Sequence, residues 1–168
     1  PFEPGQVWLA GAGPGSLGCL TLEVIAALSQ ADAVVYDALV DPAALRAAEG
    51  AELRFVGKRR GQPSTPQEAI NTIMITLARR GDRVVRLKGG DPNIFGRGGD
   101  EALALARAGV PFRVLPGVTS AFGALAANWR HFVDWVGVVV IAVFLHNALA
   151  IASGWGAARA AGLSERDR

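Results

Sequence analysis

A segment dense in glycine, residues 89–99, constrains the fold of this chain more than any other feature. It follows the apolar run Val84–Lys88 and contains five glycines in eleven residues. Glycine loses the most conformational entropy on folding and buries no side chain, so this density is typical of backbone that takes positive φ or lies against a ligand. The segment therefore predicts a ligand-approaching loop between a buried strand and a helix, rather than an ordinary turn.

A second strand, glycine loop and helix come earlier in the chain, at residues 7–10, 11–15 and 20–31. The stretch Gly13–Gly18 satisfies the G-x-G-x-x-G pattern of dinucleotide-binding proteins. Pro14 argues against that interpretation, because proline fixes φ inside the loop and removes an amide donor. A nicotinamide or flavin site therefore stays an alternative, and a binding loop of another kind is favoured.

Strand-like runs alternate with helical runs along the chain, at Val7–Ala10, Ala33–Tyr36, Leu53–Val56, Val84–Lys88 and Phe112–Leu115. This alternation predicts an α/β fold, a mostly parallel five-stranded sheet flanked by helices. Ligands of such sheets bind beyond the carboxyl ends of the strands. Residues suited to binding follow each strand: Gly11–Gly15, Asp37, Lys58, Gly89–Asp91 and Pro116–Ser120.

Two helix boundaries are marked by local signals. Thr65–Glu68 has the form of a capping box with proline at the first helical position, and predicts a helix that ends at Gly81. A further helix is expected over residues 99–108, ending at Gly109.

Six segments resemble the tetrapyrrole methylases, in family order and with near-family spacing: Val7–Gly15, Ala31–Val40, Val56–Gly61, Pro66–Asn71, Val84–Glu101 and Gly109–Ser120. The combination of Gly-Lys-Arg after the third strand with Leu-Lys-Gly-Gly-Asp-Pro-Asn-Ile-Phe-Gly-Arg-Gly-Gly is similar to the uroporphyrinogen-III C-methyltransferases rather than to relatives of the cobalamin pathway. The resemblance covers residues 6–127.

This resemblance implies S-adenosylmethionine as the cofactor and C-methylation of uroporphyrinogen III to precorrin-2, for sirohaem or cobalamin biosynthesis. It places cofactor contacts on Pro14, Gly89, Gly90, Asp91, Ile94, Thr119 and Ser120. It implies an acid/base pair, Asp37 and Lys58, and a homodimer. Arg59, Arg60 and Arg97 are expected to bind the carboxylates of the substrate, although Arg97 could instead pair with Asp100 or Glu101.

The resemblance ends after Ala127, so we divide the chain into a methylase-like domain at 1–127 and a hydrophobic helical tail at 128–168. Residues 135–155 contain no charged side chain, and tryptophans flank them as at membrane interfaces. Their number is about what a bilayer requires. Membrane contact through 135–155 is therefore predicted, with His146 and Asn147 unfavourable in hydrocarbon unless they find hydrogen-bond partners.

Composition bears on the expected ligands and on the cellular location of the protein. A net charge of +2 implies no nucleic-acid footprint, and no metal site is expected because His131 and His146 lack further ligands at suitable spacing. A single cysteine, Cys19, and no signal peptide at the N-terminus predict a cytoplasmic protein, with membrane association through the tail as the alternative.

Because the chain begins with Pro1 and the family's second domain does not follow, we expect a truncated methyltransferase. The alternatives are an inactive cofactor-binding fragment tethered to a membrane by its tail, and another tetrapyrrole methylase that acts on a precorrin.

Overall fold

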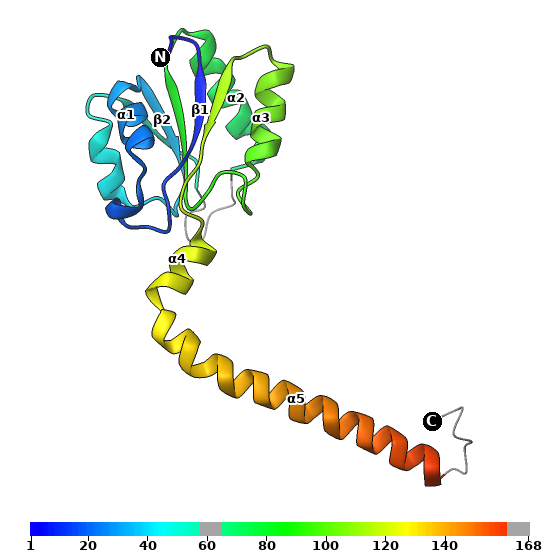
Figure 1. Ribbon diagram of the computed structural model, residues 1–168. Helices are drawn as coiled ribbons and strands as arrows, with labels where there is room; N and C mark the ends of the chain where they lie inside the picture. The colour runs from blue at the N-terminus through cyan, green and yellow to red at the C-terminus, as the bar shows by residue number, and fades with distance from the viewer. Residues whose placement is uncertain (58–64, 161–168) are drawn as a thin grey trace. The chain divides into compact units, whose positions relative to one another are not determined.

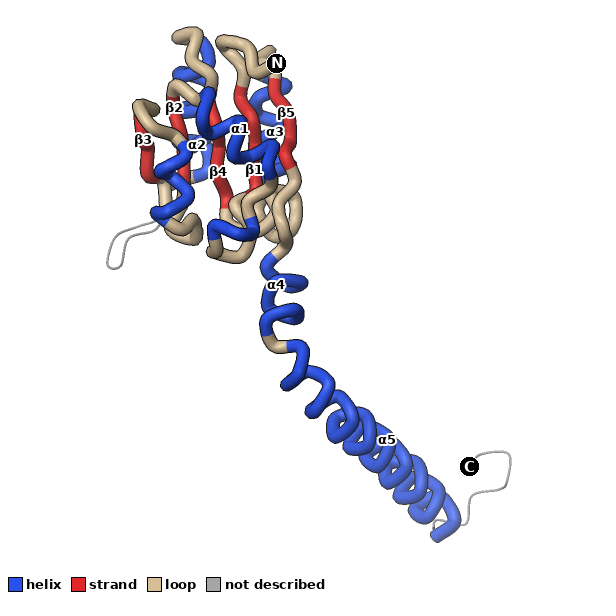
Figure 2. The backbone as a smooth tube through the Cα atoms, turned by 60° about the vertical axis from the view of Figure 1, so that its left-hand side comes forward, coloured by secondary structure: helices blue, strands red, loops and turns tan. Residues whose placement is uncertain are grey.

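The computed structural model describes residues 1–57 and 65–160. The chain divides into two units, Pro1–Ala124 and a second unit that begins at Leu125 (Figure 1). The first contains five parallel strands: β1 (Val7–Gly11), β2 (Ala33–Tyr36), β3 (Glu52–Phe55), β4 (Val84–Lys88) and β5 (Phe112–Leu115). Their order in the sheet is β3-β2-β4-β1-β5 (Figure 2). The predicted α/β fold with a parallel sheet is confirmed.

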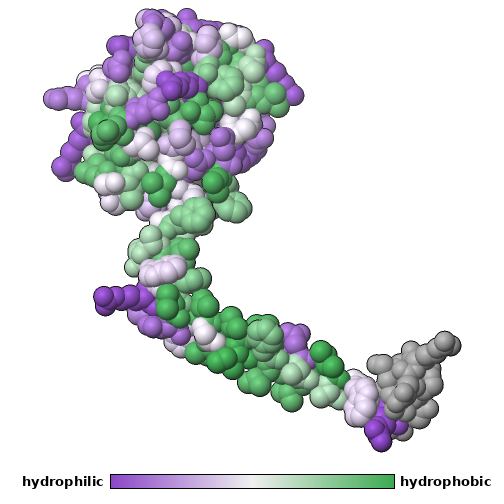
Figure 3. Space-filling view, viewed as in Figure 1, coloured by the Kyte–Doolittle hydropathy of each residue, from purple (hydrophilic) through white to green (hydrophobic). Residues whose placement is uncertain are grey.

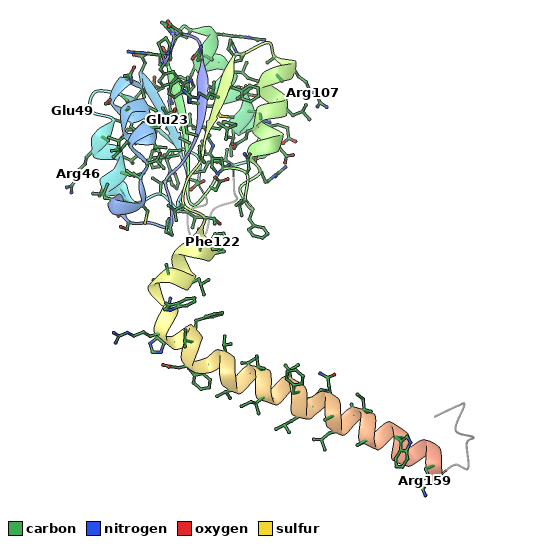
Figure 4. The ribbon with its side chains drawn as sticks, in the orientation of Figure 1. Glu23, Arg46, Glu49, Arg107, Phe122 and Arg159 are labelled. Carbon is green, nitrogen blue, oxygen red and sulfur yellow. The ribbon has the colours of Figure 1, made fainter. Side chains whose placement is uncertain are left out.

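Helices cover both faces of this sheet, as a parallel sheet requires. The helix α1 (Leu22–Gln30) and the 3-10 helix η2 (Pro42–Ala47) pack on one face, where side chains such as Trp8 and Val85 are buried. The helices α2 (Gln67–Arg79) and α3 (Gly98–Arg107) cover the other. A short 3-10 helix, η1 (Leu17–Cys19), follows the first glycine loop. The labelled Glu23, Arg46 and Arg107 project outward from this unit (Figure 4).

The ends of the helices follow local chemistry, with one exception. The Thr21 hydroxyl accepts from the Val24 N–H at 3.3 Å and caps α1. Gly81 and Gly109 take φ of 95° and 67° just beyond α2 and α3, which confirms the predicted ends. The predicted capping box of α2 is wrong: Pro66, with ψ of 146°, is itself the N-cap residue and offers no capping side chain, so Thr65 lies outside the helix.

The second unit is helical over nearly all of its described residues, 125–160. The helix α4 (Ser120–Ala127) leads out of the first unit, and α5 (Trp129–Ala160) follows it. The side chains of α5 are exposed wherever the structure describes them, and a hydrophobic surface runs along its visible face (Figure 3). The predicted hydrophobic C-terminal helix is therefore confirmed. Within Trp129–Gly156 an 18-residue window reaches a mean hydropathy of 2.2, so this helix is long and apolar enough to cross a membrane by length and composition.

Candidate functional site

The loops that follow β1 and β4 are hydrogen-bonded to each other at the carboxyl edge of the sheet. The Gly13 N–H donates to the Gly90 carbonyl at 3.1 Å, and the Gly90 N–H donates to the Gly13 carbonyl at 2.7 Å. The Ala12 N–H donates to the Lys88 carbonyl at 2.7 Å. Because β1 and β4 are neighbours in the sheet but distant in sequence, these bonds join the two glycine loops into one platform.

Glycine is required where the loops after β1, β4 and β5 converge. A Cβ on Gly11 would lie 2.5 Å from the Gly90 carbonyl oxygen and 2.6 Å from Gly117 Cα. A Cβ on Gly117 would lie 2.3 Å from the same carbonyl oxygen. No side chain fits at these distances, so this part of the glycine density is explained by contact between loops.

A cleft of about 320 Å³ opens beside this platform. Its walls come from the segments after β2 and β4 and from the start of α4. The lining residues are Asp37, Leu39, Lys88, Gly89, Ile94, Phe95, Gly96, Arg97, Thr119, Ser120 and Ala121. The cleft lies where ligands of parallel sheets bind, outside the carboxyl ends of the strands.

Asp37, directly after β2, has both carboxylate oxygens occupied. Its Oδ1 accepts from the Leu39 N–H at 3.1 Å, and its Oδ2 lies 3.6 Å from Arg86 Nη2. The side chain is 23% exposed, so it remains accessible from the cleft. This arrangement gives a carboxylate of fixed orientation that a ligand can reach.

Behind the cleft lies a cluster of buried charged groups. Lys88 and Arg86, on the same face of β4, both bond to Glu101 in the first turn of α3. Burial lowers the pKa of the Lys88 ammonium from its ordinary value, and the nearby Arg86 cation adds to this effect. The carboxylates of Glu101 and Asp37 oppose the shift.

The loop between β4 and α3 is held by Asp91. Its Oδ1 accepts from the Asn93 N–H at 2.9 Å, and its Oδ2 accepts from the Gly117 N–H at 3.1 Å. Asp91 therefore links the loops after β4 and β5. Further along, Phe95 is 99% exposed, and both Phe95 and Arg97 take positive φ, which is uncommon for residues with a side chain.

The structure brings together six of the site residues predicted from sequence: Asp37, Gly89, Ile94, Arg97, Thr119 and Ser120 line the cleft. Pro14, Gly90 and Asp91 lie in the adjoining loops but not in its lining. Arg97 is 64% exposed and pairs with Asp100 at 2.8 Å, not with Glu101. The predicted Lys58, Arg59 and Arg60 lie outside the described residues.

Sequence reasoning missed Lys88 as a lining residue and Arg86 and Glu101 behind it. The sequence did contain a pattern that indicates burial of Arg86 and Lys88. Two cations at alternate positions of an otherwise apolar central strand must share one face, and on a sheet covered on both sides that face is buried. Glu101 carried no comparable signal, because an acidic residue in the first turn of a helix is common at the surface.

Comparison with known proteins decides the family. The model of the Tetrapyrrole (Corrin/Porphyrin) Methylases matches residues 6–161. The chain belongs to the tetrapyrrole methylases. This family match includes residues 128–161 of the segment predicted to be a hydrophobic tail.

Individual tetrapyrrole methylases match about three quarters of the chain. A uroporphyrinogen-III C-methyltransferase of Sinorhizobium sp is 56% identical over 126 residues, which are 74% of this chain and 45% of the relative. The crystal structure of uroporphyrin-III-C-methyltransferase from Thermus thermophilus has 54% identity and a TM-score of 0.65, and covers 73% of this chain and 51% of that one.

A structure of uroporphyrin-III C-methyl transferase from Thermus thermophilus complexed with S-adenyl homocysteine has 46% identity and a TM-score of 0.59, over 68% of this chain and 46% of that one. The chain thus spans about half the length of these relatives.

Proposed function

We propose that the first unit binds S-adenosylmethionine in the cleft and contributes to the C-methylation of uroporphyrinogen III. The observation that carries this proposal is the cleft itself: its lining gathers Asp37, Gly89, Ile94, Thr119 and Ser120 from three separate loops. These residues lie in the motifs that resemble the uroporphyrinogen-III C-methyltransferases. The similar Thermus protein complexed with S-adenyl homocysteine supports the choice of cofactor.

The residues of the cleft fit such a cofactor. Gly89 offers backbone without a side chain, since a Cβ there would lie 2.6 Å from Leu39 Cβ. Ile94 is 45% exposed and offers an apolar wall. Thr119 and Ser120, at the start of α4, offer hydroxyl and amide groups to polar parts of the ligand. When bound, S-adenosylmethionine supplies an activated methyl group on a sulfonium.

Asp37 is proposed to take the proton that the ring system must lose after methylation, since a general base has to lie within reach of that proton. Arg97 is proposed to bind a substrate carboxylate, which would replace Asp100 as its partner. Lys58, Arg59 and Arg60 keep the roles predicted from sequence, as an acid/base partner and as carboxylate ligands.

The test measures cofactor binding and turnover separately on the full chain in detergent. Calorimetry with S-adenosylhomocysteine reports on the cleft, and transfer of a labelled methyl group to uroporphyrinogen III reports on the reaction. Saturable binding with turnover supports the proposal, and a chain that binds no S-adenosylhomocysteine contradicts it.

Binding without turnover would identify an inactive cofactor-binding fragment. Methyl transfer only to a precorrin would identify another tetrapyrrole methylase. Sedimentation in the same detergent tests the homodimer implied by the family.

We also propose that α5 lies in a lipid bilayer. Apolar side chains are exposed all round it, with Trp129 and Trp155 near the two ends of the candidate span. The Asn147 amide donates to the Val143 carbonyl at 2.8 Å, so one of its N–H donors is satisfied within the helix. The protein would then be cytoplasmic in its first unit and attached to the membrane by α5.

Membrane fractionation of the full chain tests this proposal, with carbonate washing to remove peripheral proteins. Retention in the washed membranes supports it. A chain that stays soluble without detergent, as a monomer or as a multimer, contradicts it.

A further inference from the structure

Three of the four buried polar or charged side chains in the described part of the protein are the charged groups behind the cleft. Glu101 is 0% exposed, Arg86 3% and Lys88 4%. Buried ion pairs rarely stabilise a fold more than well-packed apolar residues would, because removing charges from water costs free energy. Stability of the fold therefore does not explain why these charges are buried, and their position against the wall of the cleft points to a role in the site.

Glu101 is the centre of the cluster. Its Oε1 accepts from Arg86 Nε at 3.1 Å, from Lys88 Nζ at 3.0 Å and from Gln67 Nε2 at 3.2 Å. Its Oε2 accepts from Lys88 Nζ at 3.1 Å. The single carboxylate thus joins the first turn of α3 to β4 and to the start of α2, and it holds both cations of β4.

The guanidinium of Arg86 is held by hydrogen bonds from more than one of its nitrogens. Besides the bond from Nε to Glu101, its Nη1 donates to the carbonyls of Val35 at 3.3 Å and Leu87 at 3.1 Å. These bonds orient the planar group so that Nη2 lies toward Asp37 Oδ2, at 3.6 Å. The direction of the Asp37 carboxylate therefore depends on how Arg86 is anchored.

The charges of the cluster reinforce this dependence. Arg86 and Lys88 bring two positive charges and Glu101 brings one negative charge, so the buried part alone is left with one uncompensated positive charge. Asp37, at the edge of the cleft, supplies the second negative charge. The carboxylate of Asp37 is thus held at the cleft by attraction as well as by the Leu39 N–H.

We propose that Glu101 is a positioning residue for the cleft: it anchors Arg86, which orients the Asp37 carboxylate, and it holds the Lys88 ammonium against the wall. This inference rests on the proposed function for the meaning of Asp37, but not for the contacts themselves. Glu101 itself touches no ligand, because its carboxylate lies behind the two cations and is fully buried.

The test uses Glu101→Gln, which keeps the size of the side chain and removes its charge. Turnover on uroporphyrinogen III is expected to fall about 10–100-fold, the scale of a small misplacement in an active site, with the affinity for S-adenosylhomocysteine within about twofold of the parent. In an Asp37→Asn background the same substitution is expected to cause no further loss of turnover. Independent, multiplicative losses in the double variant would overturn the proposal, because residues that act through one another are non-additive.

A second measurement does not depend on turnover. Lys88 should react slowly with acetic anhydride in the parent and several-fold faster in Glu101→Gln, as read by mass spectrometry of its peptide. In a crystal structure of the variant, Arg86 Nη2 should lie too far from Asp37 Oδ2 to form an ion pair. Unchanged labelling, or an ion pair that persists, overturns the proposal even if the parent chain proves inactive, in which case the proposed function fails separately.

The matched control is Asp32→Asn. It removes an ion pair to Arg83, which precedes the same strand at the opposite end, with distances of 2.8–2.9 Å. Lys88 labelling and turnover should stay at parent values in this control. An equal rise in Lys88 labelling would show general loosening of the sheet, and would overturn a specific role for Glu101.

Discussion

The two units of this chain use apolar side chains in opposite ways. In the first unit, Leu9, Val34 and Val85 are wholly buried between the sheet and its helices. In α5, Val138 and Val140 are 56% and 46% exposed. Since burial of apolar surface is the main favourable term in folding, the first unit supplies its own partners, whereas α5, as a single helix, cannot bury these side chains by itself.

Polar groups show the same contrast. In the first unit, even fully buried charges have several partners from different elements, as Glu101 does. In α5, the Asn147 amide bonds only to a carbonyl of its own helix. A helix that satisfies its backbone groups internally can enter hydrocarbon, where no water is present to satisfy them.

The largest effect is expected from a charge in the middle of α5. Val140→Lys should raise the free energy of membrane insertion by about 3–4 kcal/mol, since lysine is strongly unfavourable at the centre of a spanning helix. The variant should move from the washed membranes into the soluble or aggregated fraction. Leu103→Lys is the control: Leu103 is 50% exposed on α3, and this variant should remain with the membranes. If both variants stay membrane-bound, the contrast between the units has another origin.

The second-largest effect is expected from a steric change in the first unit. Gly11→Ala places a Cβ within 2.7 Å of backbone atoms of Gly90 and Gly117, and should lower the free energy of unfolding by about 3 kcal/mol. Urea denaturation in detergent measures this change. Gly99→Ala is the matched control, because Gly99 lies in α3 and its Cβ would meet nothing within 4 Å. Equal stability of the two variants would show that the loops have room to separate.

Much of the difference between the two units could be predicted from the sequence, because it depends on patterns within short stretches of chain. The alternation of strands and helices, the glycine loops and the uncharged run at 135–155 are each contained in a short stretch of chain. The N-cap of α2 was misplaced by one residue, because Pro66 took the position expected for Thr65. Such shifts are ordinary at helix ends.

The buried cluster could not be predicted in the same way. Glu101 meets Lys88 and Gln67 only because α3 and α2 pack against the same face of β4. Its neighbour Asp100, which is chemically alike and adjacent in sequence, instead pairs at the surface with Arg97. The two acidic residues differ in the direction they face on the helix, and tertiary packing decides which of them is buried.

A substitution at Asp91 tests whether this residue binds the cofactor or only joins the loops after β4 and β5. Asp91→Ala should weaken S-adenosylhomocysteine binding by about 1–3 kcal/mol, the range for a lost hydrogen bond to a charged or buried partner. Because Asp91 Oδ2 also accepts from the Gly117 N–H, some loss of stability should accompany it. Asp91→Asn, which keeps one acceptor oxygen, separates the two effects in calorimetry and urea denaturation. Unchanged affinity in a folded Asp91→Ala protein would restrict Asp91 to joining the loops.

The smallest effect should come from an ion pair at the surface of the first unit. Hydrogen bonds from the Arg83 side chain and backbone N–H lower the pKa of Asp32 from 3.8 to about 2. A lowered carboxylate pKa stabilises the fold above the unfolded value, and this stability is lost as pH falls through the folded value. Because Asp32 is 41% exposed, solvent screening limits the contribution to less than about 1 kcal/mol.

Asp32→Asn should therefore be slightly less stable than the parent at pH 5, and the difference should disappear near pH 2. Urea denaturation at both pH values, at low and high salt, measures it. Salt should reduce the difference at pH 5, because exposed charges are screened. A difference that persists at pH 2 would mean that Asp32 stabilises the start of β4 by packing or by neutral hydrogen bonds.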